Sequence, residues 1–195
     1  MHRLVMKRTF LRTVRVLPRP LAASRGLVVA GHVVLPCALG KGGVARLKRE
    51  GDGATPLGRF ALGALYLRTD KGARPRSGLP ARRTRPDDGW CDAPGDRRYN
   101  RPVRLPYPAS HERMWREDDV YDRVLDIRYN RGPIRPGRGS AIFMHLARPG
   151  FAPTAGCVAL RRADLDRLLP RLGPRTLLVI GNDPRRSCPT RKQKR

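Results

Sequence analysis

The chain has 195 residues, enough for one domain with a buried core. It carries 42 Lys and Arg against 16 Asp and Glu, and the formal net charge of +26 favours anionic partners such as nucleic acid, acidic wall polymer or anionic lipid. The arginines do not form one helix stripe and no nucleic-acid-binding signature is present, so we expect no dedicated nucleic-acid partner. No apolar stretch reaches the roughly 18 residues of a transmembrane helix.

The two ends of the chain are basic and differ in composition from the region between them. Residues 1–24 look like a basic extension, residues 25–182 like the folded domain, and residues 183–195 like a basic, disordered tail. Arginines interrupt every apolar window near the start, so no hydrophobic region of a signal peptide is recognised. The residues alone therefore leave a cytoplasmic location open, beside export by another route.

Short apolar runs between turn residues begin at Leu27. LVVAG at 27–31 and VVLPCALG at 33–40 predict a pair of strands joined as a hairpin. A glycine-rich loop at 48–58 precedes a predicted strand, RFALGALYL, at 59–67. Residues 70–102 are rich in Arg, Pro and Gly and show little periodicity, which is typical of a functional or disordered loop.

The second half of the chain continues the pattern of short strands. VYDRVLDIRYN at 120–130 alternates apolar and polar residues imperfectly and predicts a strand. SAIFMHL at 140–146 is a short apolar strand with His145 near its end. After a loop rich in Gly and Pro comes CVAL at 157–160, and TLLVI at 176–180 is the last predicted strand.

One segment has the period of an amphipathic helix. RADLDRLLPRL at 162–172 places leucines at i, i+3, i+4 and i+7. Pro170 strains a helix at that point, so we expect the helix to end or kink near Leu169. The prediction is therefore a mainly β domain with one amphipathic helix.

The cysteines do not form a metal-binding pattern. None lies in a CxxC motif or pairs with a histidine at zinc-finger spacing, so we expect no metal and no other cofactor. A disulfide between Cys37 and Cys91 is an alternative in an oxidising compartment. The remaining cysteines are Cys157 and Cys188.

Cys157 is the strongest candidate nucleophile. A thiolate is favoured by nearby positive charge and by a helix N-terminus, and Cys157 precedes the predicted helix and lies near Arg161 and Arg162 in sequence. Gly156 removes a side chain where a substrate carbonyl could approach backbone N–H groups, so the amides of Gly156 and Cys157 are a candidate oxyanion hole. The alternative is a small buried thiol without chemistry.

A nucleophilic thiol needs a base within hydrogen-bond reach, and His145 is the first candidate. Eleven residues, including several prolines and glycines, separate it from Cys157, and such a loop can fold back and bring its ends together. His32 and His111 are rival bases. His111 lies in PASHERMW with Trp115, a polar and aromatic segment that suits a substrate cleft.

Two motifs together resemble the L,D-transpeptidase (YkuD-like) catalytic domain family. The first is the strand Ser-Ala-Ile-Phe-Met-His at 140–145, followed after a loop by Thr-Ala-Gly-Cys-Val at 154–158. The second is Thr-Pro-Leu-Gly-Arg-Phe at 55–60, similar to the family's Thr-Pro-x-Gly-x-Phe turn. The resemblance extends over about residues 27–180, and it implies an L,D-transpeptidase-like β-sandwich or barrel.

The resemblance also implies acyl transfer through a thioester in cell-wall biogenesis. Cys157 would attack a diamino-acid carbonyl in a tetrapeptide stem of peptidoglycan, and His145 would take the thiol proton and return it to the leaving amine. An amine of a second stem would then accept the acyl group, in the cell envelope. Two alternatives stay open: water as the acceptor, as in a carboxypeptidase, and a non-catalytic basic module that binds anionic polymer.

Three positions depart from the family pattern. Leu146 follows the base where the family often has Gly or Ser, Ala155 stands where His is frequent, and Ala159 stands where Arg or Asn is frequent. The groups that hold the substrate's carboxylates are therefore sought elsewhere. Arg161 and Arg162 are candidates because a guanidinium group binds a carboxylate bidentately, and His111 and Trp115 are candidate wall residues of the same site.

Overall fold

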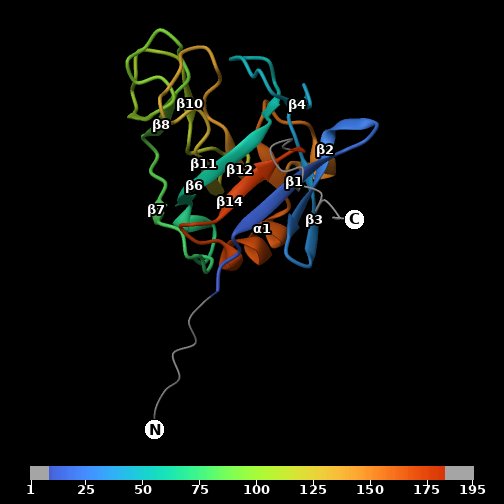
Figure 1. Cartoon of the computed structure of the whole chain (residues 1–195). Helices are drawn as coiled ribbons and strands as arrows, with labels where there is room; N and C mark the ends of the chain where they lie inside the picture. The colour runs from blue at the N-terminus through green and yellow to red at the C-terminus, as the bar shows by residue number, and fades with distance from the viewer. Residues whose placement is uncertain (1–8, 183–195) are drawn as a thin grey trace.

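A computed structural model describes residues 9–182, whose main feature is a sheet that closes on itself (Figure 1). The strand order is β11-β12-β13-β3-β2-β1-β14-β6-β7, and β11 also pairs with β6, which makes a barrel. The mainly β prediction is confirmed. The strands are β1 (Thr13–Arg19), β2 (Ala22–Ala30), β3 (Val33–Ala38), β6 (Gly58–Leu67), β7 (Ala81–Arg83), β11 (Arg123–Ile127), β12 (Phe143–Leu146), β13 (Val158–Leu160) and β14 (Leu177–Ile180).

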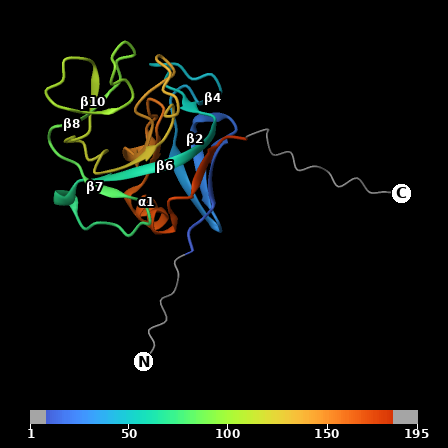
Figure 2. The ribbon, with the colours of Figure 1, turned by 60° about the vertical axis from the view of Figure 1, so that its left-hand side comes forward.

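A second sheet is inserted between β7 and β11. This inserted sheet consists of β10 (His111–Arg113), β8 (Asp88–Cys91) and β9 (Pro102–Arg104), in that order. In both ribbon views it lies at the upper left, away from the helix α1 (Figures 1 and 2). The region 70–102, predicted as a loop, therefore contains β7 and β8. The shorter elements are β4 (Val44–Ala45), β5 (Thr55–Pro56), η1 (Thr69–Lys71) and η2 (Pro149–Phe151).

The predicted basic extension needs a correction, because part of residues 1–24 forms strands of the barrel wall. β1 pairs with β2 antiparallel and with β14 parallel. Val14 and Val16 are fully buried and alternate with Arg15, whose side chain points to the other face of the strand. The arginines and prolines around this alternation hide it in the sequence. The predicted tail at 183–195 lies outside the described residues.

The helix prediction is confirmed. α1 spans Arg162–Leu168, and η3 (Leu169–Arg171) continues it as one 3₁₀ turn that contains Pro170. Proline lacks an N–H and its ring clashes with the preceding turn, which ends the α-helix where expected. The apolar face packs into the barrel core through Leu165, Leu168, Leu169 and Leu172, each at most 1% exposed.

A second hydrophobic cluster lies between the barrel and the inserted sheet. Phe143 on β12 contacts Trp90 of β8 edge-to-face, with ring centroids 4.9 Å apart, and Tyr121 at 6.0 Å. Met144 on the opposite face of β12 belongs to the barrel core. β12 is therefore buried on both faces, and Cys157 belongs to the cluster under the inserted sheet.

The three cysteines of the described region are free thiols. Cys37 belongs to the barrel core and Cys91 lies on β8 of the inserted sheet, so the alternative of a Cys37–Cys91 disulfide is not realised. Cys188 lies outside the described residues. Across residues 9–182, the helices are too short or too polar to cross a bilayer.

Candidate active site

The structure brings Cys157 and His145 to the same face of a parallel strand pair. On β12 and β13, His145 is opposite Ala159. Side chains alternate along a strand, so Cys157, two residues before Ala159, points to the same side as His145. Both line one cavity of about 290 Å³, in which they are 7% and 6% exposed. The predicted nucleophile and the predicted base therefore line the same cavity.

The Cys157 thiol is held between two backbone groups. Its Sγ accepts a hydrogen bond from the Phe143 N–H at 3.3 Å and donates one to the Ala141 carbonyl at 3.3 Å. Burial raises the pKa of Cys157 to about 12, although the Phe143 N–H opposes that rise. The group at rest is a neutral thiol, and it needs a base before it can act as a nucleophile.

His145 is oriented by a backbone carbonyl. Its Nδ1 lies 2.9 Å from the Leu146 carbonyl oxygen. A carbonyl only accepts, so Nδ1 carries the hydrogen and Nε2 keeps its lone pair. Burial lowers the pKa of His145 to about 4, and the Tyr121 ring packs against the imidazole at 5.2 Å. At neutral pH the imidazole is uncharged and can take a proton on Nε2.

A short hydroxyl-capped turn presents the cysteine. Thr154 Oγ1 donates to the Cys157 carbonyl at 2.7 Å and accepts from the Gly156 N–H at 3.1 Å. Gly156 has φ of +135°, a conformation that L side chains rarely adopt. Because Thr154 engages the Gly156 amide, the predicted oxyanion role of Gly156 requires the substrate carbonyl to share or replace that bond.

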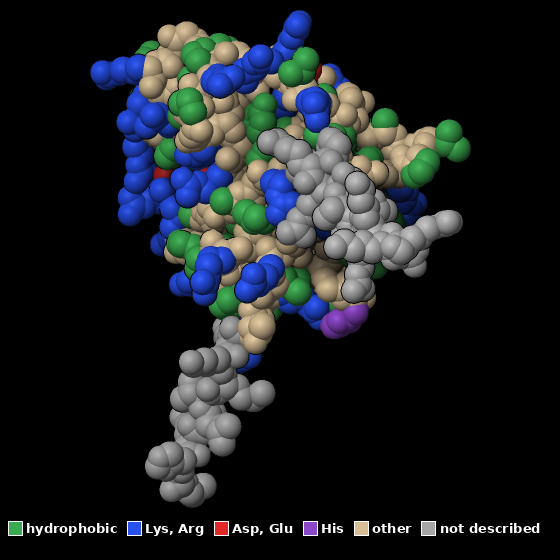
Figure 3. Space-filling model, in the orientation of Figure 1, with side chains coloured by type: hydrophobic (Ala, Val, Ile, Leu, Met, Phe, Trp, Pro, Cys, Tyr) green, Lys and Arg blue, Asp and Glu red, His purple; other side chains and the backbone are tan. Residues whose placement is uncertain are grey.

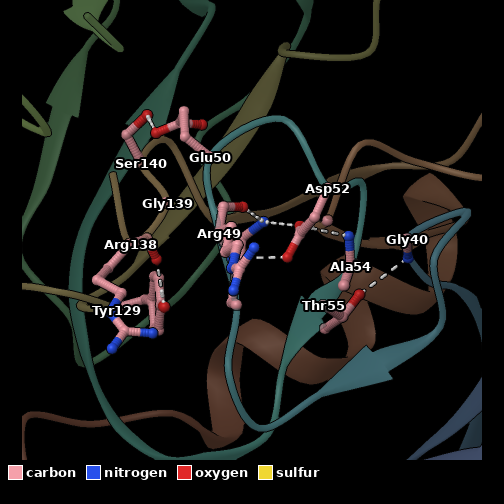
Figure 4. Close-up of polar contacts among 12 residues, drawn as sticks. Gly40, Arg49, Glu50, Asp52, Ala54, Thr55, Tyr129, Arg138, Gly139 and Ser140 are labelled. Atoms are coloured by element: carbon pink, nitrogen blue, oxygen red, sulfur yellow. Dashed lines mark hydrogen bonds and ion pairs between the residues drawn. The ribbon is translucent and has the colours of Figure 1, made fainter. Parts of the chain in front are cut away.

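The Thr-Pro motif is connected to this turn through the backbone of residues 40 and 41. Thr55 is fully buried, and its Oγ1 accepts a hydrogen bond from the Gly40 N–H at 2.8 Å (Figure 4). Gly40 forms an isolated β-bridge with Thr154, and the Lys41 N–H donates to the Thr154 carbonyl at 2.9 Å. The two motifs that lie far apart in sequence thus meet through one backbone segment.

The loop before the Thr-Pro motif is closed by an aspartate. Asp52 accepts hydrogen bonds from the Arg49 and Ala54 N–H groups at 2.7 and 2.9 Å (Figure 4). It also pairs with Lys48 Nζ at 2.7 Å, and Lys48 is 3% exposed and lines the cavity. Glu50 of the same loop accepts from Ser140 Oγ at 2.7 Å, which fixes the loop against the segment before β12. The loop that contains Lys48 and Glu50 therefore forms a wall of the cavity that is fixed by hydrogen bonds and an ion pair.

Charged side chains of both signs line the cavity. The cations are Lys41, Lys48, Arg116 and Arg148, and the carboxylates are Glu50, Asp92 and Glu112. Glu112 belongs to the polar and aromatic segment that the sequence suggests for a substrate cleft, whereas the other six residues are not selected from the sequence. Alternation on β10 places Glu112 on the face opposite His111. Among residues 9–182, His, Cys, Asp and Glu do not gather in threes that could hold a metal ion.

The two arginines predicted to bind substrate lie outside the cavity lining. The Arg161 guanidinium stacks on the Phe151 ring, 4.9 Å from its centroid. Arg162 forms an ion pair with the buried Asp122. Both groups already have partners in the fold, whereas Ala159, at the position where the family often has Arg or Asn, faces the cavity.

The predicted aromatic wall residues and the rival bases also lie elsewhere. His111 Nδ1 bonds to the Ala109 carbonyl at 2.7 Å, and Trp115 is covered by the Arg68 guanidinium at 3.4 Å. His32 occupies the exposed turn between β2 and β3, beside Arg171. The geometry therefore selects His145 as the histidine next to Cys157.

The comparison with protein families gives one match. A family model described as YkuD, the L,D-transpeptidase catalytic domain, matches residues 22–180. This span covers well over half of the chain and contains the Thr-Pro motif, β12 and the cysteine turn. No curated protein and no solved structure matches the chain.

Proposed function

Because the chain belongs to the L,D-transpeptidase catalytic domain family, whose members act on peptidoglycan, we propose that it is a cysteine acyltransferase that cross-links peptidoglycan stem peptides. The observation that carries the proposal is the shared cavity of Cys157 and His145 on one face of β12 and β13. The thiol is neutral and buried, and the base beside it is neutral with a free nitrogen. This pairing suits a nucleophile that is activated only when substrate fills the cavity.

In the first half-reaction, His145 Nε2 takes the thiol proton as Cys157 Sγ attacks the carbonyl carbon of the diamino acid in a tetrapeptide stem. The S–C bond forms, and the C–N bond to the terminal D-amino acid breaks. The proton on His145 passes to the leaving amine. The Leu146 carbonyl, which accepts from Nδ1–H, stabilises the imidazolium while it exists.

In the second half-reaction, an amine of another stem attacks the thioester carbonyl. His145 is neutral again and takes the amine proton, the N–C bond forms, and the S–C bond breaks. The proton then returns to the cysteine thiolate. The carbonyl oxygen becomes negative in both steps, and the Gly156 and Cys157 amides are the proposed donors to it.

The proposed site of action is the cell envelope, with which the family is usually associated. The high positive charge is compatible with a location on an acidic wall polymer. Catalysis and wall binding would then use separate parts of the molecule, because the cavity itself is lined by both signs of charge.

The test is covalent labelling at Cys157. The wild-type protein is incubated with a tetrapeptide stem or a carbapenem, and intact mass is measured against Cys157→Ala. We expect an acyl adduct on the wild type and none on the variant, with matching circular dichroism spectra. Equal acylation of the two proteins would sink the proposal.

A further inference from the structure

Two carboxylates of the inserted sheet face the cavity side by side. Glu112 on β10 is paired with Trp90 on β8, and Asp92 comes two residues after Trp90. Alternation along β8 therefore places Asp92 on the same face as Glu112. Both carboxylates line the cavity that contains Cys157.

Asp92 lacks a partner. Within residues 9–182 its side chain forms no ion pair and no hydrogen bond, and its Oδ1 is shielded from solvent. Lys and Arg outnumber Asp and Glu in this chain by 42 to 16, so a cation for a structural pair is readily available. A shielded carboxylate oxygen without a donor is unfavourable, and a cationic ligand would relieve that cost.

In the described part of the chain, Glu112 has one cationic partner, which it shares with another carboxylate. Arg116 Nη1 lies 3.1 Å from Glu112 Oε1, but Nε and Nη2 of the same guanidinium bind Asp118 at 2.9 and 2.8 Å. Burial raises the pKa of Glu112. Burial also raises the pKa of Cys157, and the charge of Glu112 adds to that rise. Glu112 and Cys157 line the same cavity.

We propose that Asp92 and Glu112 bind the primary ammonium group of the acyl acceptor, which makes an amine rather than water the acceptor. The inference rests on the proposed function, because it concerns the second half-reaction. A water acceptor needs no anionic site, whereas an ammonium group held by two carboxylates has its nitrogen beside the thioester. The ammonium group first gives one proton to a carboxylate, which releases it to solvent, and the free amine then attacks the thioester carbonyl. On attack the N–C bond forms, the nitrogen gives a second proton to His145, and the S–C bond breaks. His145 then returns that proton to the Cys157 thiolate.

The cavity also has cations that could meet the rest of such a ligand. Lys41 and Lys48 come from the barrel loops, whereas the two carboxylates belong to the inserted sheet. A diamino-acid acceptor carries carboxylate groups beside its amine, and these would meet the lysines while the ammonium group meets Asp92 and Glu112. The cavity lining thus carries both signs of charge, as such a ligand does.

The experiment measures how the acyl-enzyme partitions between amine and water. The wild type, Asp92→Asn, Glu112→Gln and the double variant receive a tetrapeptide donor with a diamino-acid acceptor, and aminolysis and hydrolysis products are counted by mass spectrometry. The ratio does not depend on how fast acyl-enzyme forms, so a slower variant is still informative. Glu117→Gln and Asp87→Asn are matched controls, because both carboxylates are exposed and lie outside the cavity.

We expect the double variant to lower the aminolysis-to-hydrolysis ratio about tenfold or more, since charge-assisted contacts are lost. Hydroxylamine is uncharged at neutral pH, and its aminolysis ratio should stay at the wild-type value. Asp92→Asn breaks no internal bond, so this variant alone should fold and still show part of the effect.

An unchanged ratio for the diamino-acid acceptor, or equal losses with hydroxylamine, would overturn the ammonium site while leaving acylation of Cys157 intact. Failure of the wild type to form any acyl-enzyme is a different result. It would overturn the proposed function and the acceptor site together.

Discussion

The Ala54 carbonyl oxygen lies directly against Gly156, and a Cβ built on Gly156 would come within 2.6 Å of it. Ala54 belongs to the loop that leads into the Thr-Pro motif, and Gly156 immediately precedes Cys157. The two family motifs therefore meet at this point without any side chain between them. The glycine before the cysteine is required by this close approach and by its φ of +135°.

Gly156→Ala should lower the free energy of unfolding by about 3 kcal/mol, because the new methyl group meets a backbone oxygen in a strained conformation. Gly150→Ala is the matched control. Gly150 has φ of +65°, but nothing lies within 4 Å of the place that its Cβ would occupy, so we expect a loss of only about 1 kcal/mol. Urea unfolding measures both values, and equal losses would contradict the role given to the Ala54 contact.

Thr55→Val should remove the acceptor of the buried Gly40 N–H while keeping the shape of the side chain. An unsatisfied buried donor costs about 1–3 kcal/mol, so we expect a loss of stability in that range. Acylation of Cys157 should also slow, because Gly40 is bridged to Thr154 of the cysteine turn. Thr69→Val, at an exposed position, is the control and should change neither the stability nor the rate of acylation. If Thr55→Val also left both quantities unchanged, the motif threonine would have another role.

The parts of the fold that follow from local pattern can be predicted from the sequence. The four leucines from α1 to Leu172 repeat at helical spacing, and Pro170 marks where the α-helix ends. The hairpin of β2 and β3 follows from two apolar runs around Gly31. β1 escapes prediction because arginines and prolines mask its alternation, and its burial depends on β14, more than 150 residues later.

The candidate site shows the same division between local and tertiary information. Cys157 and His145 can be selected because they stand in ordered motifs. Glu112 can be suspected because it lies in a polar and aromatic segment. Asp92 reaches the cavity only because the inserted sheet folds over β12, which no spacing in the sequence reveals. The partner of Arg162 is also tertiary information, because Asp122, 40 residues earlier, pairs with it and Arg162 is not part of the cavity lining.

Binding to an acidic wall polymer should depend on the surface charge and not on Cys157. Lys and Arg side chains are spread over the face drawn in Figure 3, where few acidic side chains are visible. Counterions are released when such a surface meets a polyanion, so binding should fall steeply between low and physiological salt. Pull-down with purified wall fragments at several salt concentrations tests this. A Cys157→Ala protein that loses binding would contradict the separation of the two activities.

The buried His145 should make the protein less stable in mild acid. Its pKa is lowered to about 4 by burial, against 6.5 for an unperturbed histidine. Between these values the unfolded chain binds a proton that the folded chain does not, so the free energy of unfolding falls as the pH drops from 6.5 to 4. At pH 7 both states are neutral and the group contributes nothing to this difference; below about pH 4 the loss reaches about 3 kcal/mol.

His145→Gln should remove this effect. The difference in unfolding free energy between wild type and variant, measured by urea titration, should therefore shift in favour of the variant by about 3 kcal/mol between about pH 7 and about pH 4. Carboxylates titrate alike in both proteins and cancel in the comparison. His32→Gln, at an exposed turn, is the control and should follow the wild type at every pH. Parallel curves for wild type and His145→Gln would mean that the imidazole charges as easily in the fold as in the unfolded chain, and His145 would then not be held as the neutral base that acylation requires.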